Sequence, residues 1–138
     1  MTSFIATFSP LDSSPHCLQG ALLVFLALAI GHAIADFPLQ GLFLSEAKNR
    51  HGDLSNYFKN QAPRGVWIHA LTAHSLIHAG AVWLITGSVV LVLIELVLHW
   101  VIDFAKCEGW TSFNTDQILH YLCKLAYAAL IWLGASWI

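Results

Sequence analysis

Histidine and acidic residues recur four positions apart along this chain. Residues four apart on an α-helix lie on one face, so both side chains can approach one ion. With 8 His and 8 Asp or Glu among 138 residues, random placement predicts roughly two such pairs, but the sequence holds six. They are Asp12 with His16, His32 with Asp36, His74 with His78, Glu95 with His99, His99 with Asp103, and Asp116 with His120. This excess predicts a shared site.

Imidazole together with carboxylate indicates a transition-metal site. These donors suit zinc, iron or manganese better than calcium or magnesium, and there are enough of them for one ion or for two. We therefore predict a divalent metal cofactor, with zinc preferred to iron or manganese. The predicted ligands are His32, Asp36, His74, His99, Asp103, Asp116 and His120. His69 and His78 lie in the same segment as His74, so which of its histidines take part is left open.

Other polar side chains near these pairs suggest catalytic and substrate-binding roles. Glu95 precedes His99 by one helical turn, and it would either orient that ligand or, like His78, act as a general base. Four further residues are predicted to lie near a substrate headgroup: Gln40, Lys48, Lys106 and Gln117. The two lysines could pair with a phosphate, which favours a phospholipid-like substrate.

A purely structural explanation competes with ligation. A single His and Asp pair in a membrane helix often forms only an interhelical hydrogen bond. Glu95 alone is equally well explained by such a bond or by a role as a proton carrier. Pairs on four helices favour ligation, because ionisable groups are costly in a bilayer and usually mark a functional site.

The composition predicts a membrane protein. Of the residues, 57% are hydrophobic and only 10% are charged, against roughly 25% charged in soluble domains. The net charge of -2 offers no basic face, which excludes nucleic acid as a partner. A bilayer core calls for about 20 mostly apolar helical residues. We predict an all-α fold, a single integral-membrane domain over residues 1–138, with four transmembrane helices running up-down-up-down at about 18–35, 66–86, 88–105 and 119–138.

The basic residues predict the orientation of these helices. Four of the six lie in the loop 37–65, which is therefore expected to be cytoplasmic, with both termini outside a multi-pass bacterial inner membrane. The paired His and Asp residues then form a layer near the cytoplasmic leaflet. Within the loop, the apolar residues at 42–44 and at 54–58 predict either short interfacial helices or a partly ordered linker.

One internal similarity links the first and third predicted helices. G-H-A-I-A-D-F begins at Gly31, and L-H-W-V-I-D-F begins at Leu98. Both segments end helices that run in the same direction in the predicted topology. Parallel duplication of a helical hairpin would explain the match, and convergence on a common site is the alternative.

Several motifs together carry a family resemblance. The chain contains H-x-x-x-D-F-P-L-Q from His32, then Lys48, H-x-x-x-H from His74, H-x-x-I-D-x-x-K from His99, and D-Q-x-x-H from Asp116. Over about residues 20–124 this order resembles the bacterial and phage membrane family catalogued as domain of unknown function 3307. The resemblance implies a helical inner-membrane protein and no particular activity. The motifs also resemble those of membrane-bound metal-dependent hydrolases.

The leading functional hypothesis is a metal-dependent hydrolase that acts on a lipid or lipid-linked substrate at the cytoplasmic leaflet. The sequence has no G-x-S-x-G nucleophile motif, so covalent catalysis is not suggested. One rival is a non-catalytic accessory subunit of a larger membrane complex. Another is a proton or metal-ion transporter, which would need homo-oligomers, and a di-iron oxidase is a further variant.

Overall fold

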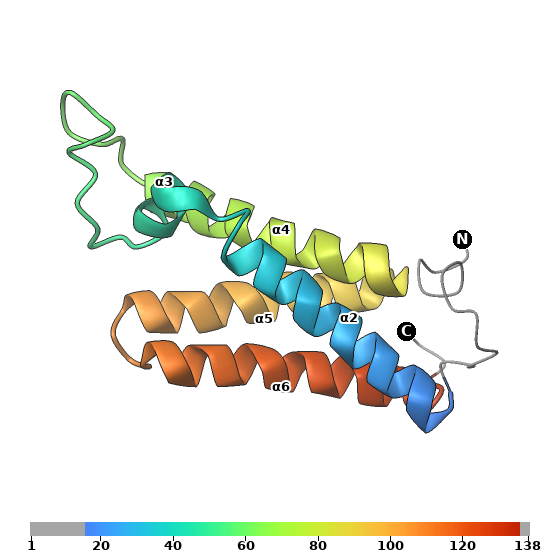
Figure 1. The fold of residues 1–138 in the computed structure, drawn as a ribbon. Coiled ribbons are helices and arrows are strands. Elements are labelled where there is room, and N and C mark those ends of the chain that lie inside the picture. Colours follow the sequence, from blue (N-terminus) through green and yellow to red (C-terminus); the bar gives the residue numbers. More distant parts are fainter. Residues whose placement is uncertain (1–15, 136–138) are drawn as a thin grey trace.

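The computed structural model describes residues 16–135, and within that range it is all-helical, as predicted (Figure 1). Asp12, from the first His and Asp pair, lies outside the described residues. The helices are α2 (Leu18–Asp36), α3 (Gly41–Ala47), α4 (Val66–Thr86), α5 (Val89–Cys107) and α6 (Phe113–Trp132).

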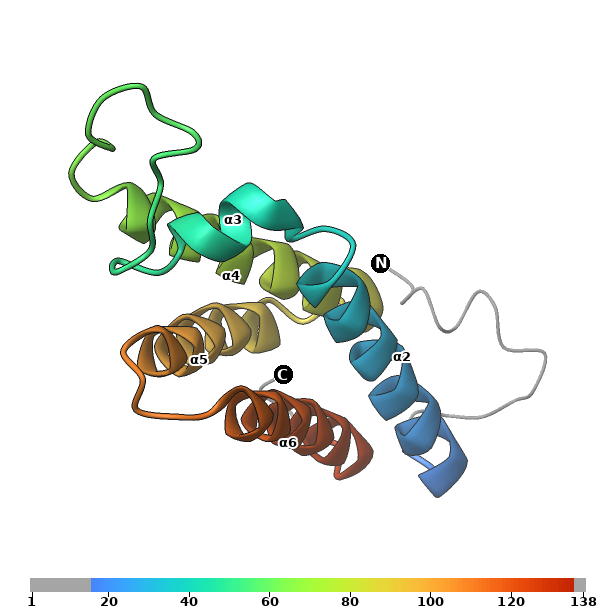
Figure 2. The same ribbon diagram turned by 60° about the vertical axis from the view of Figure 1, so that its left-hand side comes forward.

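The long helices form a closed ring of neighbours. α4 packs on α5, α5 on α6, α6 on α2, and α2 on α4. α2 is therefore diagonal to α5, and α4 is diagonal to α6, as the second view also indicates (Figure 2). Along the chain the four helices alternate in direction, so that members of a diagonal pair run the same way (Figure 1). All four can therefore contribute side chains to one interior.

Local capping explains where the helices begin and end. Gly87 ends α4 with a φ of 70°, a conformation that glycine adopts without strain. The Ser88 hydroxyl then accepts from the backbone N–H of Leu91 at 3.2 Å and starts α5. α6 begins six residues before the predicted start at 119, since Ser112 caps it by accepting from the Thr115 N–H at 3.1 Å. The predicted start was late because the first turn of α6 is polar, so the apolar run alone misses it.

The interior of the bundle is apolar at one end and polar towards the other. The apolar part lies where α2 and α5 begin and where α4 and α6 end. It contains Val24, Leu28, Val82, Leu91, Tyr127 and Ala128. The remaining interior positions of the same helices are filled by histidine, carboxylate and lysine side chains.

The outer surface of the bundle is rich in large apolar side chains. On α2, every fourth residue from Leu18 to Ile34 points outward, and these side chains are 47–62% exposed. α5 and α6 also expose apolar residues, among them Leu93, Val97 and Leu125. The described helices thus place many polar groups inside and many apolar groups outside.

Two of the described helices, α2 and α4, are long and apolar enough to cross a membrane. The core helix of a soluble protein can pass the same test of length and composition, so the result alone does not establish a membrane protein. α5 is as apolar on average as α4, but it carries three charged residues, Glu95, Asp103 and Lys106. α6 is less apolar overall, although its outer face exposes large apolar side chains.

The segment between α2 and α4 folds back onto the bundle. α3 packs against α4, and Ala47, Leu54 and Ala70 form a small apolar core there. A helix thus forms at the first of the two apolar stretches predicted in this loop. The second stretch, around Leu54 and Phe58, makes turns instead of a helix.

Candidate metal centre

Five histidines fill the polar part of the interior, and each has at most 1% of its surface exposed. They come from all four long helices: His32 from α2, His74 and His78 from α4, His99 from α5, and His120 from α6. His69 is exposed on the outer side of α4, so the two deeper histidines of that helix are the ones that join the cluster.

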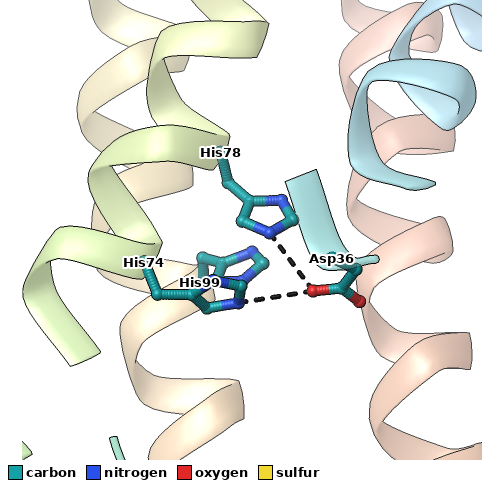
Figure 3. Close-up of side chains that lie close together, drawn as sticks. All are labelled: Asp36, His74, His78 and His99. Carbon is teal, nitrogen blue, oxygen red and sulfur yellow. Dashed lines mark ion pairs between the residues drawn. The ribbon is translucent and has the colours of Figure 1, made fainter. Parts of the chain in front are cut away.

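A first set of ligand atoms surrounds one carboxylate oxygen of Asp36 (Figure 3). The Oδ1 atom lies 3.3 Å from His74 Nε2 and 3.2 Å from His78 Nε2. His99 completes the set, since one ligand atom from each residue lies within 4.8 Å of the others. We name these residues group A: Asp36, His74, His78 and His99.

A second set lies on α5 and α6. His120 Nε2 lies 3.5 Å from Asp103 Oδ1 and 3.6 Å from Asp116 Oδ1, and the three ligand atoms lie within 4.8 Å of one another. We name Asp103, Asp116 and His120 group B. His32, His99 and His120 form a further set under the same distance limit, so the two groups share one contiguous cluster.

Most ligand atoms of these groups lack hydrogen bonds within the described part of the chain. The buried atoms without a partner include Nε2 of His74, His78, His99 and His120, and Oδ1 of Asp116. An unsatisfied buried polar group costs about 1–3 kcal/mol. A tetrahedral ion with bonds of about 2.1 Å spaces its ligands about 3.4 Å apart, and the nitrogen–oxygen separations above are 3.2–3.6 Å. The buried groups are therefore able to hold a metal ion.

The charge of the cluster also suits a cation. Four buried or nearly buried carboxylates, those of Asp36, Glu95, Asp103 and Asp116, face only two buried ammonium groups, those of Lys48 and Lys124. With the carboxylates ionised and the histidines neutral, two negative charges are left uncompensated in this part of the structure. Buried charge is costly unless it is paired or coordinates a metal.

Hydrogen bonds hold the second oxygen of both aspartates that lie at helix C-terminal ends. Asp36 Oδ2 accepts from the Gln117 side chain at 2.8 Å. Asp103 Oδ2 accepts from Lys48 at 2.6 Å, and the same lysine donates to Gln40 Oε1 at 2.8 Å. Such contacts fix the orientation of a ligand and leave its first oxygen free for an ion.

These contacts define where the predicted headgroup residues lie. Gln40, Lys48 and Gln117 are at the cluster, but their polar atoms contact its carboxylates, His32 or each other. Lys106 points elsewhere, with its Nζ 5.9 Å from the centre of the Phe113 ring. A direct role of all four in binding a headgroup stays a prediction.

Glu95 and Lys124 form a buried ion pair behind His99. Glu95 Oε1 accepts from Lys124 Nζ at 2.5 Å and lies 3.2 Å from His99 Nδ1. This arrangement directs His99 Nε2 towards the cluster, as in the carboxylate–histidine–metal arrangement of many zinc sites. Of the roles weighed for Glu95, the contacts match both an interhelical bond, to Lys124, and orientation of His99. Its roles as a base and as a proton carrier stay predictions.

Lys124 was not among the residues singled out from the sequence. The sequence could have indicated that Lys124 belongs to the cluster, because it follows His120 by four residues and therefore lies on the same face of α6. It also interrupts an otherwise apolar run, which is costly at a buried position without an acidic partner.

His32 differs from the other histidines of the cluster because both of its ring nitrogens have neighbours. Nδ1 lies 3.2 Å from His78 Nδ1. Nε2 lies 3.3 Å from Asp36 Oδ2 and 3.4 Å from Gln117 Oε1. His32 therefore bonds within the cluster and has no unpartnered nitrogen.

Comparison with known proteins confirms the family expected from the motifs. The model of a family described as "Protein of unknown function (DUF3307)" matches residues 24–138 and so covers the whole cluster. No curated protein and no solved structure matches the chain.

Proposed function

This chain belongs to the DUF3307 family, and we propose that it is a membrane-embedded, metal-dependent hydrolase that acts on a lipid or lipid-linked substrate. The observation that carries the proposal is the cluster of buried, unpartnered imidazole nitrogens that lies together with the carboxylates of Asp36, Asp103 and Asp116. When bound there, a divalent ion, zinc in the first place, supplies an activated water and polarises a carbonyl or phosphoryl group.

The distribution of polar and apolar residues supports placement in a bilayer. Buried polar side chains include five histidines, three carboxylates and two lysines, whereas large apolar side chains cover the outer faces of the long helices. In water this arrangement would leave an extensive apolar surface exposed. In lipid the same surface faces its preferred solvent, and ionisable groups face the bundle interior.

A lipid-like substrate fits the edge of the cluster between α2 and α6. Asp36 is its most accessible carboxylate, with 11% of the side chain exposed. Asp36 and Gln117, which are hydrogen-bonded to each other, bridge the two helices at this point. The flanking residues Phe37 and Ile118 are exposed and apolar, so a lipid tail would contact them while the headgroup approaches Asp36.

The side chains of the cluster have two proposed roles, binding metal and orienting the metal ligands. Groups A and B bind metal. Gln117, Lys48 and Glu95 orient the ligands Asp36, Asp103 and His99 through the hydrogen bonds described above. His78 contributes Nε2 to group A, which favours ligation over the base role that was also predicted for it.

Hydrolysis of phospholipid by the purified protein tests this function. Full-length protein in detergent or liposomes should release product from a panel of phospholipids. Extraction of metal with a chelator should stop the reaction, and added zinc should restore it, because in the proposed function the ion supplies the activated water and polarises the scissile group. Asp116→Ala should be inactive, while His69→Ala, on the exposed face of α4, should retain activity. Bound metal without hydrolysis of any lipid would instead favour an accessory or transport role.

Side-specific cysteine labelling tests the proposed topology. With Cys17, Cys107 and Cys123 changed to alanine, Asn60→Cys in the loop after α3 should react only from the cytoplasmic side of the inner membrane. Val89→Cys, in the exposed first turn of α5, should react only from outside. The reverse pattern would place the cluster near the outer leaflet.

Two of the basic residues behind the predicted orientation are paired with acidic side chains. Of the four basic residues in the loop, Lys48 is buried against Asp103, and Arg50 pairs with Glu108 at 2.5 Å. Lys59 and Arg64 lie on the exposed surface of the same loop. Because Arg50 is already paired with Glu108, the labelling result decides whether Lys59 and Arg64 suffice to keep the loop inside.

A further inference from the structure

The metal-binding residues repeat between the two helical hairpins. α2 and α5 each carry His and Asp four residues apart, His32 with Asp36 and His99 with Asp103. α4 and α6 each carry a pair with the same spacing whose second residue is a histidine. These pairs are His74 with His78 and Asp116 with His120. These helices are diagonal partners that run in the same direction (Figures 1 and 2).

Group A and group B are equivalent under this repeat. Group A takes Asp36, His74 and His78 from the first hairpin. The corresponding residues of the second hairpin are those of group B: Asp103, Asp116 and His120. The fourth member of group A, His99, is contributed by the opposite hairpin, and its counterpart is His32.

We propose that the cluster binds two metal ions, one in group A with four protein ligands and one in group B with three protein ligands and an open position. The inference rests on the metal binding in the proposed function and assigns the reacting position within it. It depends on two differences between the groups. They differ in the number of imidazole and carboxylate donors, and His99 has an unpartnered nitrogen whereas both nitrogens of its counterpart, His32, have neighbours.

Group A has the donor set of a closed zinc site. Three imidazole nitrogens and one carboxylate oxygen lie within 4.8 Å of one another. The Nε2 atoms of all three histidines are buried without hydrogen-bond partners in the described structure, so each has a lone pair available. Four protein ligands with tetrahedral spacing are typical of zinc sites that admit no further ligand.

Group B lacks the fourth ligand because His32 is engaged elsewhere. Its Nδ1 atom pairs with His78 at 3.2 Å, and Nε2 faces Asp36 and Gln117. Group B therefore offers two carboxylate oxygens and the His120 nitrogen. Three protein ligands and one open position are typical of catalytic zinc sites, where water or substrate binds.

The two groups are close enough to act on one substrate. The His99 ring stacks on His78 of group A with a centroid separation of 3.7 Å, and on His120 of group B with 4.1 Å. Gln117 also joins the groups, since its Nε2 donates to Asp36 at 2.8 Å and to Asp116 at 3.3 Å. Paired ions in such proximity stabilise the attacking and leaving oxygens of a displacement at phosphorus.

Charge then specifies the class of substrate. The cluster without metal carries two uncompensated negative charges, so two divalent ions would leave two positive charges in excess. An anionic group at the open position of group B offsets them. A phosphate ester of a lipid supplies such a group, and a neutral carboxyl ester does not, so the inference selects phospholipid-type substrates.

Metal content of the full-length protein tests the number of sites. Purified protein loaded with zinc and washed with a weak chelator should hold two zinc ions per chain by elemental analysis. His74→Ala with His78→Ala should hold one, Asp116→Ala should hold one, and the combination should hold none. His69→Ala should still hold two. One ion in the wild-type protein, or loss of both ions when only group B is changed, would overturn the inference.

Cobalt substitution tests which site is open. Inorganic phosphate should change the visible spectrum of cobalt in the variant that retains group B, His74→Ala with His78→Ala. It should leave the spectrum of the Asp116→Ala variant, which retains group A, unchanged. A phosphate response confined to Asp116→Ala would refute the assignment of the open position. Circular dichroism of each variant verifies that the helices are retained.

The number of bound ions and the hydrolysis of phospholipid can fail independently of each other. Two ions per chain without hydrolysis would keep the two-site assignment and remove the hydrolase. One ion with zinc-dependent phospholipid hydrolysis would keep the hydrolase and remove the two-site assignment.

Discussion

Replacing His99 with glutamine is expected to lower the metal content by half or more, almost as severely as replacing it with alanine. His99 Nε2 is buried, unpartnered and directed into the cluster, and its Nδ1 is held by Glu95 at 3.2 Å. Glutamine is nearly as large and can hydrogen bond, but an amide is a poor substitute for imidazole on zinc-like ions. Elemental analysis of His99→Gln and His99→Ala beside the wild-type protein measures the effect.

A packing role for His99 predicts a different result. A hydrogen bond between membrane helices contributes about 0.6 kcal/mol on average, so glutamine would largely replace the histidine and alanine would cost little. Both variants should still insert and stay helical, because insertion depends on the apolar runs of the helices. Metal content at the wild-type level in His99→Gln would therefore contradict ligation by His99 and weaken the case for the whole cluster.

Replacing Lys124 with methionine is expected to destabilise the protein strongly. Lys124 and Glu95 are each 1% exposed, and the lysine is the charged partner closest to that carboxylate. Removal of one member of a buried ion pair leaves an uncompensated charge and costs about 3–5 kcal/mol. Thermal unfolding of Lys124→Met in detergent, followed by circular dichroism, should show a clearly lower midpoint than for the wild-type protein.

The internal repeat supplies a matched double variant. Leu28 precedes His32 as Glu95 precedes His99, and Val82 follows His78 as Lys124 follows His120. The first hairpin thus has a buried apolar pair where the second has the ion pair. Glu95→Leu combined with Lys124→Val should restore the unfolding midpoint, because apolar replacement of a buried ion pair is often neutral or stabilising.

The same double variant should bind metal poorly even though its unfolding midpoint is restored. Without Glu95, His99 loses the acceptor at Nδ1 that orients its ring, and loss of such a partner typically lowers metal affinity about 10–100-fold. Competition with a zinc chelator measures the change. A double variant with wild-type affinity would mean that the ion pair serves stability alone, and a stable Lys124→Met would mean that Glu95 is not held as a charge.

The helices and the membership of the cluster were largely predictable from spacing. A separation of four places two side chains on one helix face whatever the rest of the chain does, and apolar runs mark the long helices. Thus every predicted metal ligand lies in the polar interior. The late start predicted for α6 shows the limit of this approach, because its polar first turn is held by the Ser112 cap and carries no apolar pattern.

Contacts between distant segments were not predictable in this way. Lys48 reaches Asp103 across 55 positions of sequence because the segment around α3 folds back onto α4. Gln117 reaches Asp36 across 81 positions because α6 closes the ring against α2. Both residues were assigned to a headgroup from their charge or polarity, whereas their partners depend on how the helices are arranged in space.

The apolar end of the bundle interior closes the polar region on one side. Beyond Glu95 and Lys124, the described interior contains Val24, Leu28, Val82 and Leu91, with Tyr127 and Ala128. An ion that enters from the α2–α6 edge would therefore meet a layer of hydrocarbon before reaching the opposite face of the bundle. For the proposed hydrolase in a membrane, no charge would pass from one face of the bilayer to the other during turnover, so the reaction rate should depend only weakly on the transmembrane voltage.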